Sequence, residues 1–433
     1  MSFPVYHHLA IAAPEILLPN KQIDLEKWAV IACDQFTSEP KYWEQVEEVV
    51  GDAPSTLRMF LPEVYLESLS VDEIDAKFRS ISVSITDYLH QGILEKKDPG
   101  FIFLDRKTKF MPSRKGMMLA IDLEQYDFTP GNKSRIRATE GTVLSRIPPR
   151  VRIRANAPIE LPHIMLLIDD PNRTVIEPAF ATLSAREQPC YDTDLMMEGG
   201  HITGYYADSA SDVTSNVISA LDALVSASDD GFLFAVGDGN HSVASAKAHW
   251  DNIKASLDTD EREIHPARFA LVEVVNIHDE GLAFEPIHRV AFGLDFNHFS
   301  SAALEYFKDQ GVSILRKSEF DALSKKPLGH VIGVTNGKED YFLCLSAPNH
   351  SLAVGVLQPF LDGLESDAIT TDYIHGEDSV RSLANEKALG FLLPSISKSS
   401  FFPTIATEGI FPRKTFSMGE AVEKRYYLES KMI

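Results

Sequence analysis

One junction in the sequence concentrates the residue types needed to bind and react with an anion. An apolar run from Gly231 to Val236 stops at the six residues Gly237-Asp238-Gly239-Asn240-His241-Ser242, and small and apolar side chains then recur at helical spacing up to Trp250. This pattern predicts a buried strand, a tight turn and a helix. Glycines let a backbone approach a ligand closely, and the start of a helix offers unpaired N–H groups and partial positive charge. We therefore expect the turn to bind a phosphate.

Each polar residue of this turn has an expected role. Asp238 and His241 supply acid and base capacity, while Gly237, Gly239, Asn240 and Ser242 form the expected cradle for a phosphate or nucleotide. Asp238 is also the candidate ligand for Mg²⁺, because Mg²⁺ bridges phosphate oxygens and needs only one or two carboxylates. The alternative is an ordinary turn in which Asn240 or Ser242 caps the helix and the other polar side chains are solvated.

An arginine-rich segment provides further candidates. Residues 131–154 contain seven basic residues and one acidic residue, Glu140, in a chain whose net charge is −22. Concentrated arginine indicates an anionic small molecule held by guanidinium contacts, although pairing with the protein's own carboxylates would explain it equally well. The candidates for phosphate binding outside the turn are Arg137, Arg146 and Lys247, and Glu140 competes with Asp238 as catalytic base. Arg150, Arg152 and Arg154 alternate at the period of a strand, which predicts an extended segment.

Bulk properties narrow the class of protein. The 433 residues contain no apolar stretch long enough for a membrane span, and the start of the chain lacks the pattern of a secretion signal. The three cysteines are far apart and odd in number, which fits reduced thiols and no zinc site. Strong negative charge opposes binding to nucleic acids and anionic membranes. We expect a cytoplasmic protein whose partner is a small anionic molecule.

The apolar periodicity predicts a mixture of helices and strands, hence an α+β fold. We place a domain boundary near residue 292, with a core over 1–292 and a smaller α/β portion over 293–433 whose tail packs back on the core. Asn336-Gly337 predicts a hairpin turn, and residues 185–204 are expected to form a loop with a flap. The predicted helices cover residues 42–50, 71–95, 211–226, 296–310 and 352–364, and the predicted strands cover residues 101–105, 116–123, 158–169, 268–277, 330–335 and 338–345.

Several segments together resemble the domain-of-unknown-function 1015 family over nearly the full length. These segments are Trp28–Thr37, Gly51–Thr56, Ala138–Thr142, the Gly237–Ser242 turn, Phe284–Arg289 and Pro412–Thr415. The turn is similar to the Asp-Gly-His-His-Arg motif of many relatives, which in turn resembles the phosphate-binding turn of the ParB, sulfiredoxin and free-serine kinase group. This resemblance implies a ParB-like nucleotide-binding core with insertions, and ATP or ADP as cofactor.

The resemblance also marks further residues and one departure. It makes Asp34, His288 and Arg289 secondary candidates, while Arg413 and Lys414 are basic residues near the end of the chain that could reach a phosphate. The chain has Asn240 where many relatives have the first histidine, and Ser242 where they have arginine. Loss of that guanidinium removes a strong phosphate contact. Either another basic residue replaces it, with Arg137, Arg146 and Lys247 as the candidates, or this branch of the family has lost or changed its activity.

Three functions are compatible with these residues. The first is transfer of a phosphoryl group from a nucleotide to a small hydroxyl compound, for example an amino acid such as serine. The second is noncatalytic binding of a nucleotide or metabolite in a regulatory protein. The third is a metal-dependent phosphohydrolase, which shares Gly-Asn-His at 239–241 but lacks the supporting Asp and His motifs.

Overall fold

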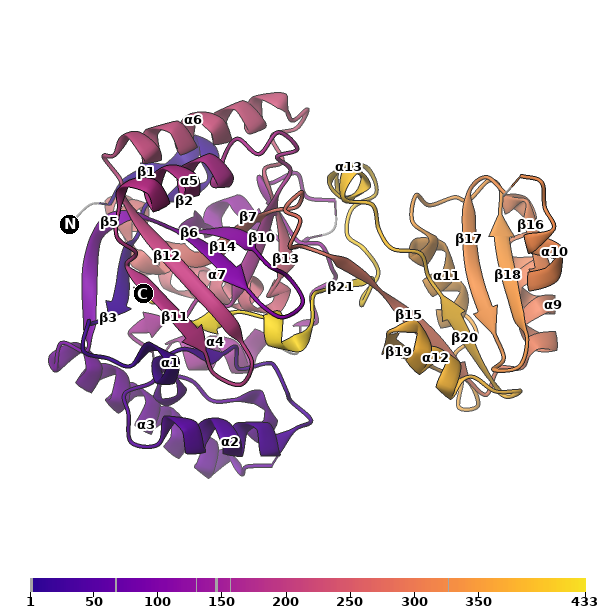
Figure 1. Cartoon of the computed structure of the whole chain (residues 1–433), viewed down its shortest axis with the longest axis horizontal. Coiled ribbons are helices and arrows are strands. Elements are labelled where there is room, and N and C mark those ends of the chain that lie inside the picture. The colour runs from indigo at the N-terminus through magenta and orange to yellow at the C-terminus, as the bar shows by residue number, and fades with distance from the viewer. Residues whose placement is uncertain (1–2, 67, 130, 145–146, 156, 326) are drawn as a thin grey trace. The chain divides into compact units, whose positions relative to one another are not determined.

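The chain forms two compact units, and each combines helices with strands. The computed structural model describes residues 3–66, 68–129, 131–144, 147–155, 157–325 and 327–433. One unit contains Met1–Leu282 together with Gly419–Ile433, and the other contains Ala283–Met418. Figure 1 shows the elements of both, and they confirm the α+β class.

The first unit is built on a large mixed sheet. Among the described residues the sheet has 12 strands, with nine in the order β11-β12-β5-β6-β14-β10-β13-β8-β7, β2 pairing β6 and β1, and β3 pairing β5. Every residue of β10 and β14 is buried; β10 is wholly apolar, and β14 is apolar except for Glu273 and Asn276. The strands are β1 (Val5–Tyr6), β2 (Ile11–Ala12), β3 (Glu15–Pro19), β5 (Leu94–Lys107), β6 (Arg114–Asp122), β7 (Tyr126–Asp127), β8 (Ile136–Arg137), β10 (Ile164–Ile168), β11 (Tyr191–Leu195), β12 (Gly200–Asp208), β13 (Phe234–Asp238) and β14 (Phe269–Asn276).

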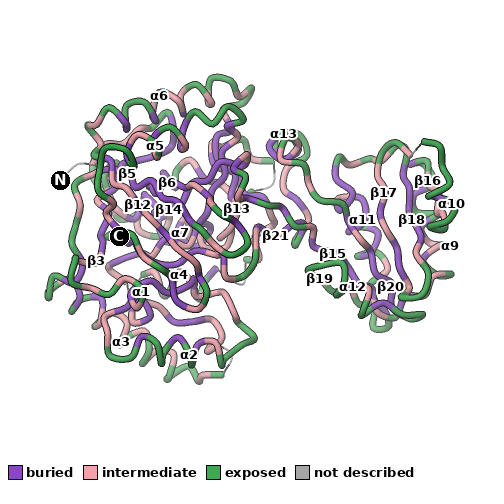
Figure 2. The backbone as a smooth tube through the Cα atoms, viewed as in Figure 1, coloured by how far each residue is buried: buried purple, intermediate pink, exposed green. Residues whose placement is uncertain are grey.

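Helices pack against this sheet with amphipathic faces. Helices α5 and α6 lie against each other, and α4 lies against α7. Figure 2 shows the outer surfaces of α3 and α6 exposed while the strands beneath are buried. None of the described helices has the length and apolar character that a bilayer span requires. The helices are α1 (Leu25–Trp28), α2 (Pro40–Val50), α3 (Val71–His90), α4 (Ile147–Ala155), α5 (Ile176–Arg186), α6 (Asp212–Ala227), α7 (Asn240–Lys254) and α8 (Thr259–Ile264).

The last residues of the chain belong to the first unit. Strand β22 (Tyr426–Tyr427) pairs with β4 (Val30–Ile31), and β23 (Lys431–Met432) pairs with β9 (Ile159–Glu160). Arg425 lies between these strands and the sheet, where its buried guanidinium donates to Glu273 and Glu429. A buried charge without its partner is strongly destabilising, so these ion pairs fix the position of Arg425 on the sheet.

The second unit has a sheet in the order β16-β18-β17-β20-β15-β19, to which β21 adds by pairing with β15. Strands β17 and β18 form the hairpin predicted around Asn336-Gly337. The elements are β15 (Phe284–Phe292), α9 (Phe296–Tyr306), β16 (Val312–Arg316), α10 (Lys317–Asp321), β17 (His330–Thr335), β18 (Asp340–Leu345), α11 (Ala353–Asp362), β19 (Thr370–His375), α12 (Glu377–Leu383), β20 (Ala388–Leu392), α13 (Lys398–Glu408) and β21 (Phe416–Met418).

Three expectations from the sequence need correction. The boundary lies after Leu282 rather than near 292, because β15 pairs only with strands of the second unit. Residues 185–204 contain most of the β11–β12 hairpin rather than a loop, since alternating polar side chains occupy its exposed face. The segment with Arg150, Arg152 and Arg154 is helix α4 rather than extended, with Pro148 tolerated in its first turn and its side packed on α7.

Arg289 joins two segments of the second unit that are far apart in sequence. This residue is 0% exposed. Its guanidinium donates to Gln358 Oε1 at 2.9 Å and to the backbone oxygens of Lys414 at 2.8 Å and Arg413 at 3.1 Å. Its charge also lies over the ring of Tyr373, 4.8 Å from the centroid. These contacts give Arg289 a structural role in fixing residues 412–415.

We expect the substitution Arg289→Gln to destabilise the second unit by about 2–4 kcal/mol, because it leaves buried carbonyl groups without donors. Urea unfolding and hydrogen exchange of the β15 and β20 amides measure this loss. Arg316→Gln removes an exposed arginine that is 3.6 Å from Glu339 and is the matched control. Equal stability of the two variants would contradict the structural role of Arg289.

Candidate functional site

The turn after β13 adopts the geometry that its glycines permit. Strand β13 ends at Asp238, helix α7 begins at Asn240, and Gly239 between them has φ +82°. A Cβ at Gly239 would lie 3.1 Å from both the His163 oxygen and the Ile164 Cα, so glycine is required by backbone conformation and by space. No side chain caps α7, which is not the capped arrangement considered as the alternative. The Gly239 amide donates to Asp238 Oδ1 at 2.8 Å, and the Ser242 and Val243 amides donate to the Gly239 oxygen at 2.9 and 3.0 Å.

Residues 138–143, which are far from this turn in the sequence, hydrogen-bond to it. Thr139 donates its amide to Asn240 Oδ1 and receives a bond from Asn240 Nδ2, both at 3.3 Å, while its hydroxyl donates to the Val236 oxygen at 2.6 Å. The amide of Val143 donates to His241 Nε2 at 3.2 Å. These bonds assign Asn240 and His241 to fixing the turn, and they bring residues 138–143, including the half-buried Glu140, beside it.

Asp238 is part of the turn and also contacts the end of the chain. Its Oδ1 accepts the Gly239 amide at 2.8 Å, and its Oδ2 accepts Lys424 Nζ at 2.9 Å. The side chain of Asp238 is 36% exposed. Lys424 places a positive charge beside the turn, which the sequence of the turn itself does not supply.

A second group of charges lies close to the first. His163, just before β10, is 2.9 Å from Asp34 Oδ2 through Nε2 and 2.7 Å from the Tyr427 hydroxyl through Nδ1. Burial alone lowers the pKa of His163, but the Asp34 carboxylate, with Tyr427 and Cys33, raises the pKa well above its usual value. Burial acts to raise the pKa of Asp34, yet His163, Gln35 and Lys424 hold it well below the usual range. The structure therefore favours an imidazolium–carboxylate pair.

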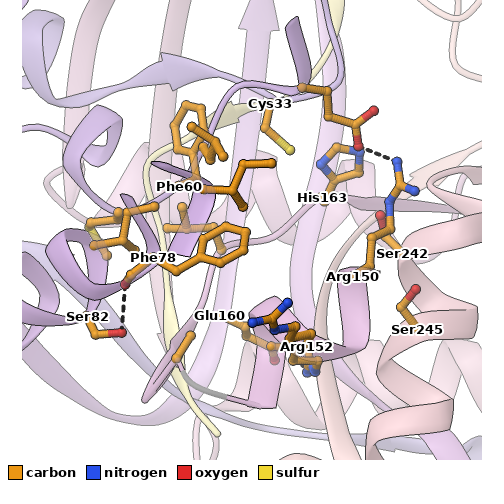
Figure 3. Close-up of a pocket in the computed structure, with 18 of the residues that line it drawn as sticks. Cys33, Phe60, Phe78, Ser82, Arg150, Arg152, Glu160, His163, Ser242 and Ser245 are labelled. Carbon is orange, nitrogen blue, oxygen red and sulfur yellow. Dashed lines mark hydrogen bonds and ion pairs between the residues drawn. The ribbon is translucent and has the colours of Figure 1, made fainter. Parts of the chain in front are cut away.

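Next to these groups the first unit contains a cavity of about 700 Å³. Figure 3 shows aromatic side chains such as Phe60 and Phe78 on one side of it, and His163, Arg150, Ser242 and Ser245 on the other. Ser242 and Ser245 come from the first turns of α7. The cavity therefore meets the candidate phosphate turn at Ser242 and has a size suited to a metabolite.

The arginines of the cavity are all paired with carboxylates. Arg150 pairs with Glu63, Arg154 pairs with Glu160, and Arg152 contacts both oxygens of Asp75 at 2.8 and 3.0 Å. Glu63, Asp75 and Glu160 themselves line the cavity. The arginine cluster therefore follows the alternative reading, in which it pairs with the protein's own carboxylates.

Two of the other predicted phosphate contacts are engaged elsewhere. Arg137 donates to Asp230 at 2.6 Å and lies 4.3 Å from the Phe232 ring centroid, so its guanidinium is held in a structural ion pair. Lys247 pairs with Asp251 at 2.9 Å along α7. The third, Arg146, lies outside the described residues.

The four secondary candidates near the end of the sequence lie in the second unit. His288 is buried, and its Nδ1 accepts the Leu393 amide at 3.1 Å. Burial is the main reason that the pKa of His288 is lowered. Arg413 and Lys414 present backbone oxygens to Arg289, as described above. These contacts give segments 284–289 and 412–415, which carry part of the family resemblance, a structural role within their own unit.

A preformed magnesium site at Asp238 does not fit the donor groups. No cluster of three or more His, Cys, Asp or Glu side chains suitable for a metal occurs in the part of the chain that the structure describes. Both carboxylate oxygens of Asp238 already accept hydrogen bonds, one of them from an ammonium group. We route no chemical step through a metal ion.

Sequence reasoning missed the roles of His163, Lys424 and Tyr427. His163 precedes the apolar run of β10, and Lys424 and Tyr427 lie in the terminal segment that the sequence predicts to pack back on the core, with no role in the site assigned to them. Their only sequence signal was the unusual retention of aromatic and basic residues up to the end of the chain. Long-range pairing of β22 with β4 brings them to the site.

Comparisons with known proteins were made for the whole chain. Residues 17–364 match the model of a family described as "Protein of unknown function (DUF1015)". No curated protein matches. Among solved structures, a free serine kinase variant in complex with AMP is 10% identical, with a TM-score of 0.38 and coverage of 70% of this chain and 94% of that chain.

Two further solved structures are similarly distant. A conserved hypothetical protein from Pyrococcus furiosus is 10% identical, with a TM-score of 0.34 and coverage of 70% of this chain and 94% of that chain. SbnI with C-terminal truncation from Staphylococcus aureus is 11% identical, with a TM-score of 0.37 and coverage of 72% of this chain and 85% of that chain.

The His163–Asp34 pair predicts a pH-dependent contribution to stability. A histidine whose folded-state pKa is raised stabilises the fold fully below its unfolded pKa of about 6.5, and this stabilisation is lost as the pH rises through the folded pKa. The depressed pKa of Asp34 adds stability above about pH 4 that is lost as the pH falls. We expect the gap in unfolding free energy between the wild type and His163→Gln to be largest near pH 5–6 and to shrink toward pH 9.

Urea unfolding at several pH values measures this gap. His298→Gln replaces an exposed histidine and is the control. A gap that stays constant from pH 5 to pH 9 would show that folding does not shift the pKa of His163, and a gap that widens with pH would show that His163 is uncharged in the folded protein.

Proposed function

The chain belongs to the DUF1015 family of proteins of unknown function, and we propose that it binds a nucleotide at the Gly237–Ser242 turn and transfers a phosphoryl group to a hydroxyl compound. The observation that carries this proposal is the uncapped start of α7, a helix of 15 residues, held open by a separate segment. ATP or ADP is the expected donor.

Several features of the turn suit a phosphate. Gly239 lets the strand pass directly into the helix, and its own amide donates to Asp238 Oδ1, so a phosphate would bind at the start of α7 beyond Gly239. The helix start provides positive potential, and Lys424 offsets the negative charge of Asp238, in a chain of net charge −22. Because Thr139 and Val143 fix Asn240 and His241, the amides need little reorganisation when an anion binds.

The proposed reaction needs only the nucleotide and the hydroxyl acceptor as reactants. An oxygen of the acceptor attacks the terminal phosphorus, the bond from that phosphorus to the nucleotide breaks, and the shortened nucleotide leaves with the electron pair. The hydroxyl proton passes to a carboxylate. Asp238 in the turn and Glu140 in the adjacent segment are the two candidates for this base.

The other two functions differ in what they require. A noncatalytic nucleotide-binding protein needs the same turn but no base, so activity measurements separate it from a kinase. A two-metal phosphohydrolase needs several carboxylate and histidine ligands around the ions. The described residues contain no group of three such ligands.

The substitution Ser242→Asp tests the phosphate site without weakening the helix. A carboxylate in the first turn of α7 stabilises the helix but repels a phosphate. We expect ADP and ATP to raise the melting temperature of the wild type and to leave that of Ser242→Asp unchanged, while the ligand-free variant is at least as stable as the wild type.

The matched control is Ser215→Asp. Ser215 is exposed and lies in the first turn of α6. Ser215→Asp therefore adds one negative charge to the first turn of a helix, as Ser242→Asp does. Retention of the nucleotide shift in Ser242→Asp, or its loss in Ser215→Asp as well, would contradict binding at the turn.

Base variants test catalysis separately from binding. Only one of the two carboxylates is the base, so we expect one of the variants Glu140→Gln and Asp238→Asn to lower phosphoryl transfer by about 100-fold or more while its ADP binding persists. Nucleotide consumption with a panel of hydroxy amino acids and alcohols measures transfer. Binding without turnover on any acceptor would favour the noncatalytic protein.

A further inference from the structure

We propose that the cavity beside the turn binds the acceptor, and that this acceptor is a neutral alcohol with a large hydrocarbon body. The inference rests on the proposed function and adds the chemical class of the second substrate. It follows from three properties of the cavity: an incompletely covered apolar helix face, paired charges, and a polar end that meets the turn.

The apolar wall comes largely from one face of α3. Ile74, Phe78 and Ile81 recur at helical spacing, line the cavity and are only half-buried. The same face continues to Ile85, which is 1% exposed in the core. The C-terminal half of this face of α3 is therefore buried by protein, whereas the N-terminal half borders the cavity.

Further apolar side chains complete this wall from other segments. They are Met59, Phe60, Leu61, Leu66, Ile159 and Leu161. A surface of this kind gains free energy when a hydrocarbon displaces water from it, by roughly 25 cal/mol per Å² of apolar area. Serine fills little of a cavity of about 700 Å³ and has almost no hydrocarbon to offer this wall.

The charges of the cavity select against a polyanion. Each of its three arginines has a carboxylate partner that also lines the cavity. A nucleotide placed there would face Glu63, Asp75 and Glu160 with its phosphates. At the start of α7 the helix dipole is positive, Lys424 offsets the carboxylate of Asp238, and Glu140 is the candidate base beside the turn. The nucleotide and the acceptor therefore have chemically different sites.

A hydroxyl group finds hydrogen-bond partners at one end of the cavity. Ser242, Ser245, His163 and Tyr427 line this end. The Tyr427 oxygen accepts the Cys33 amide at 3.2 Å and contacts His163 Nδ1 at 2.7 Å, and the Tyr427 hydroxyl donates to Cys33 Sγ at 3.6 Å. Because Ser242 is also in the turn, an alcohol bound here lies next to the proposed phosphate position.

The reaction joins these two sites. The alcohol oxygen forms a bond to the terminal phosphorus of the nucleotide, whose bond to the leaving nucleotide breaks. The alcohol proton passes to Glu140 or Asp238 and then to solvent. The products are the phosphomonoester of the alcohol and the nucleotide shortened by one phosphate.

A fluorescent probe measures occupancy of the cavity in the full-length protein. N-phenyl-1-naphthylamine, which is neutral and apolar, should bind the wild type and be displaced by dodecanol and farnesol but not by serine. Ile74→Trp fills the cavity and Phe78→Ser removes part of its wall, and we expect each to weaken probe binding at least tenfold. Val83→Ser, on the exposed side of α3, is the control and should bind the probe normally.

The outcomes separate this inference from the proposed function. Displacement of the probe by serine, by ADP, or not at all by the alcohols overturns the acceptor site, while a nucleotide shift that depends on Ser242 leaves the proposed function intact. Absence of any nucleotide shift overturns the proposed function and the acceptor role with it. Melting temperatures of Ile74→Trp and Val83→Ser that agree show that lost probe binding is not unfolding.

A direct product assay completes the test. Wild-type protein with ATP and farnesol should yield farnesyl phosphate by mass spectrometry, and Ile74→Trp should reduce that yield at least tenfold. Turnover of serine with no turnover of either alcohol would overturn the inference.

Discussion

The buried ion pairs of Arg425 are the interaction on which the candidate site depends. Arg425 donates to Glu273 on β14 and to Glu429, and all three side chains are almost completely buried. Such a cluster is stable only when all its charges are matched, so it fixes the last segment of the chain in one position on the sheet. Lys424 and Tyr427 are neighbours of Arg425, and this constraint places the first beside Asp238 and the second beside His163.

The sequence predicted those parts of the site that depend on local backbone geometry. A buried strand that ends in glycine and is followed by small residues at helical spacing describes β13, the turn and α7 correctly. It also singled out Glu140 and the turn, which the structure brings together through Thr139. Glycines and short polar residues limit the local conformations so strongly that a pattern within the chain suffices.

The parts that depend on tertiary pairing were not predictable in the same way. The period-two spacing of Arg150, Arg152 and Arg154 indicated a strand, but packing against α7 and pairing with Glu63, Asp75 and Glu160 stabilise a helix. Intrinsic preference and spacing are weak signals when tertiary contacts satisfy another conformation. His163 carried no local signal at all, because its partners are 129 and 264 residues away.

Family-specific segments do not all mark chemistry. Arg289 donates hydrogen bonds to the backbone of residues 413 and 414 within the second unit. Asp34, in another such segment, instead contacts His163 beside the cavity. The difference lies in access: Arg289 is fully buried among protein acceptors, and Cys33, His163 and Tyr427 line a space that a ligand can enter. Lys424, supplied by a distant segment, offsets the carboxylate of Asp238, and Ser242 at the start of α7 lines the cavity.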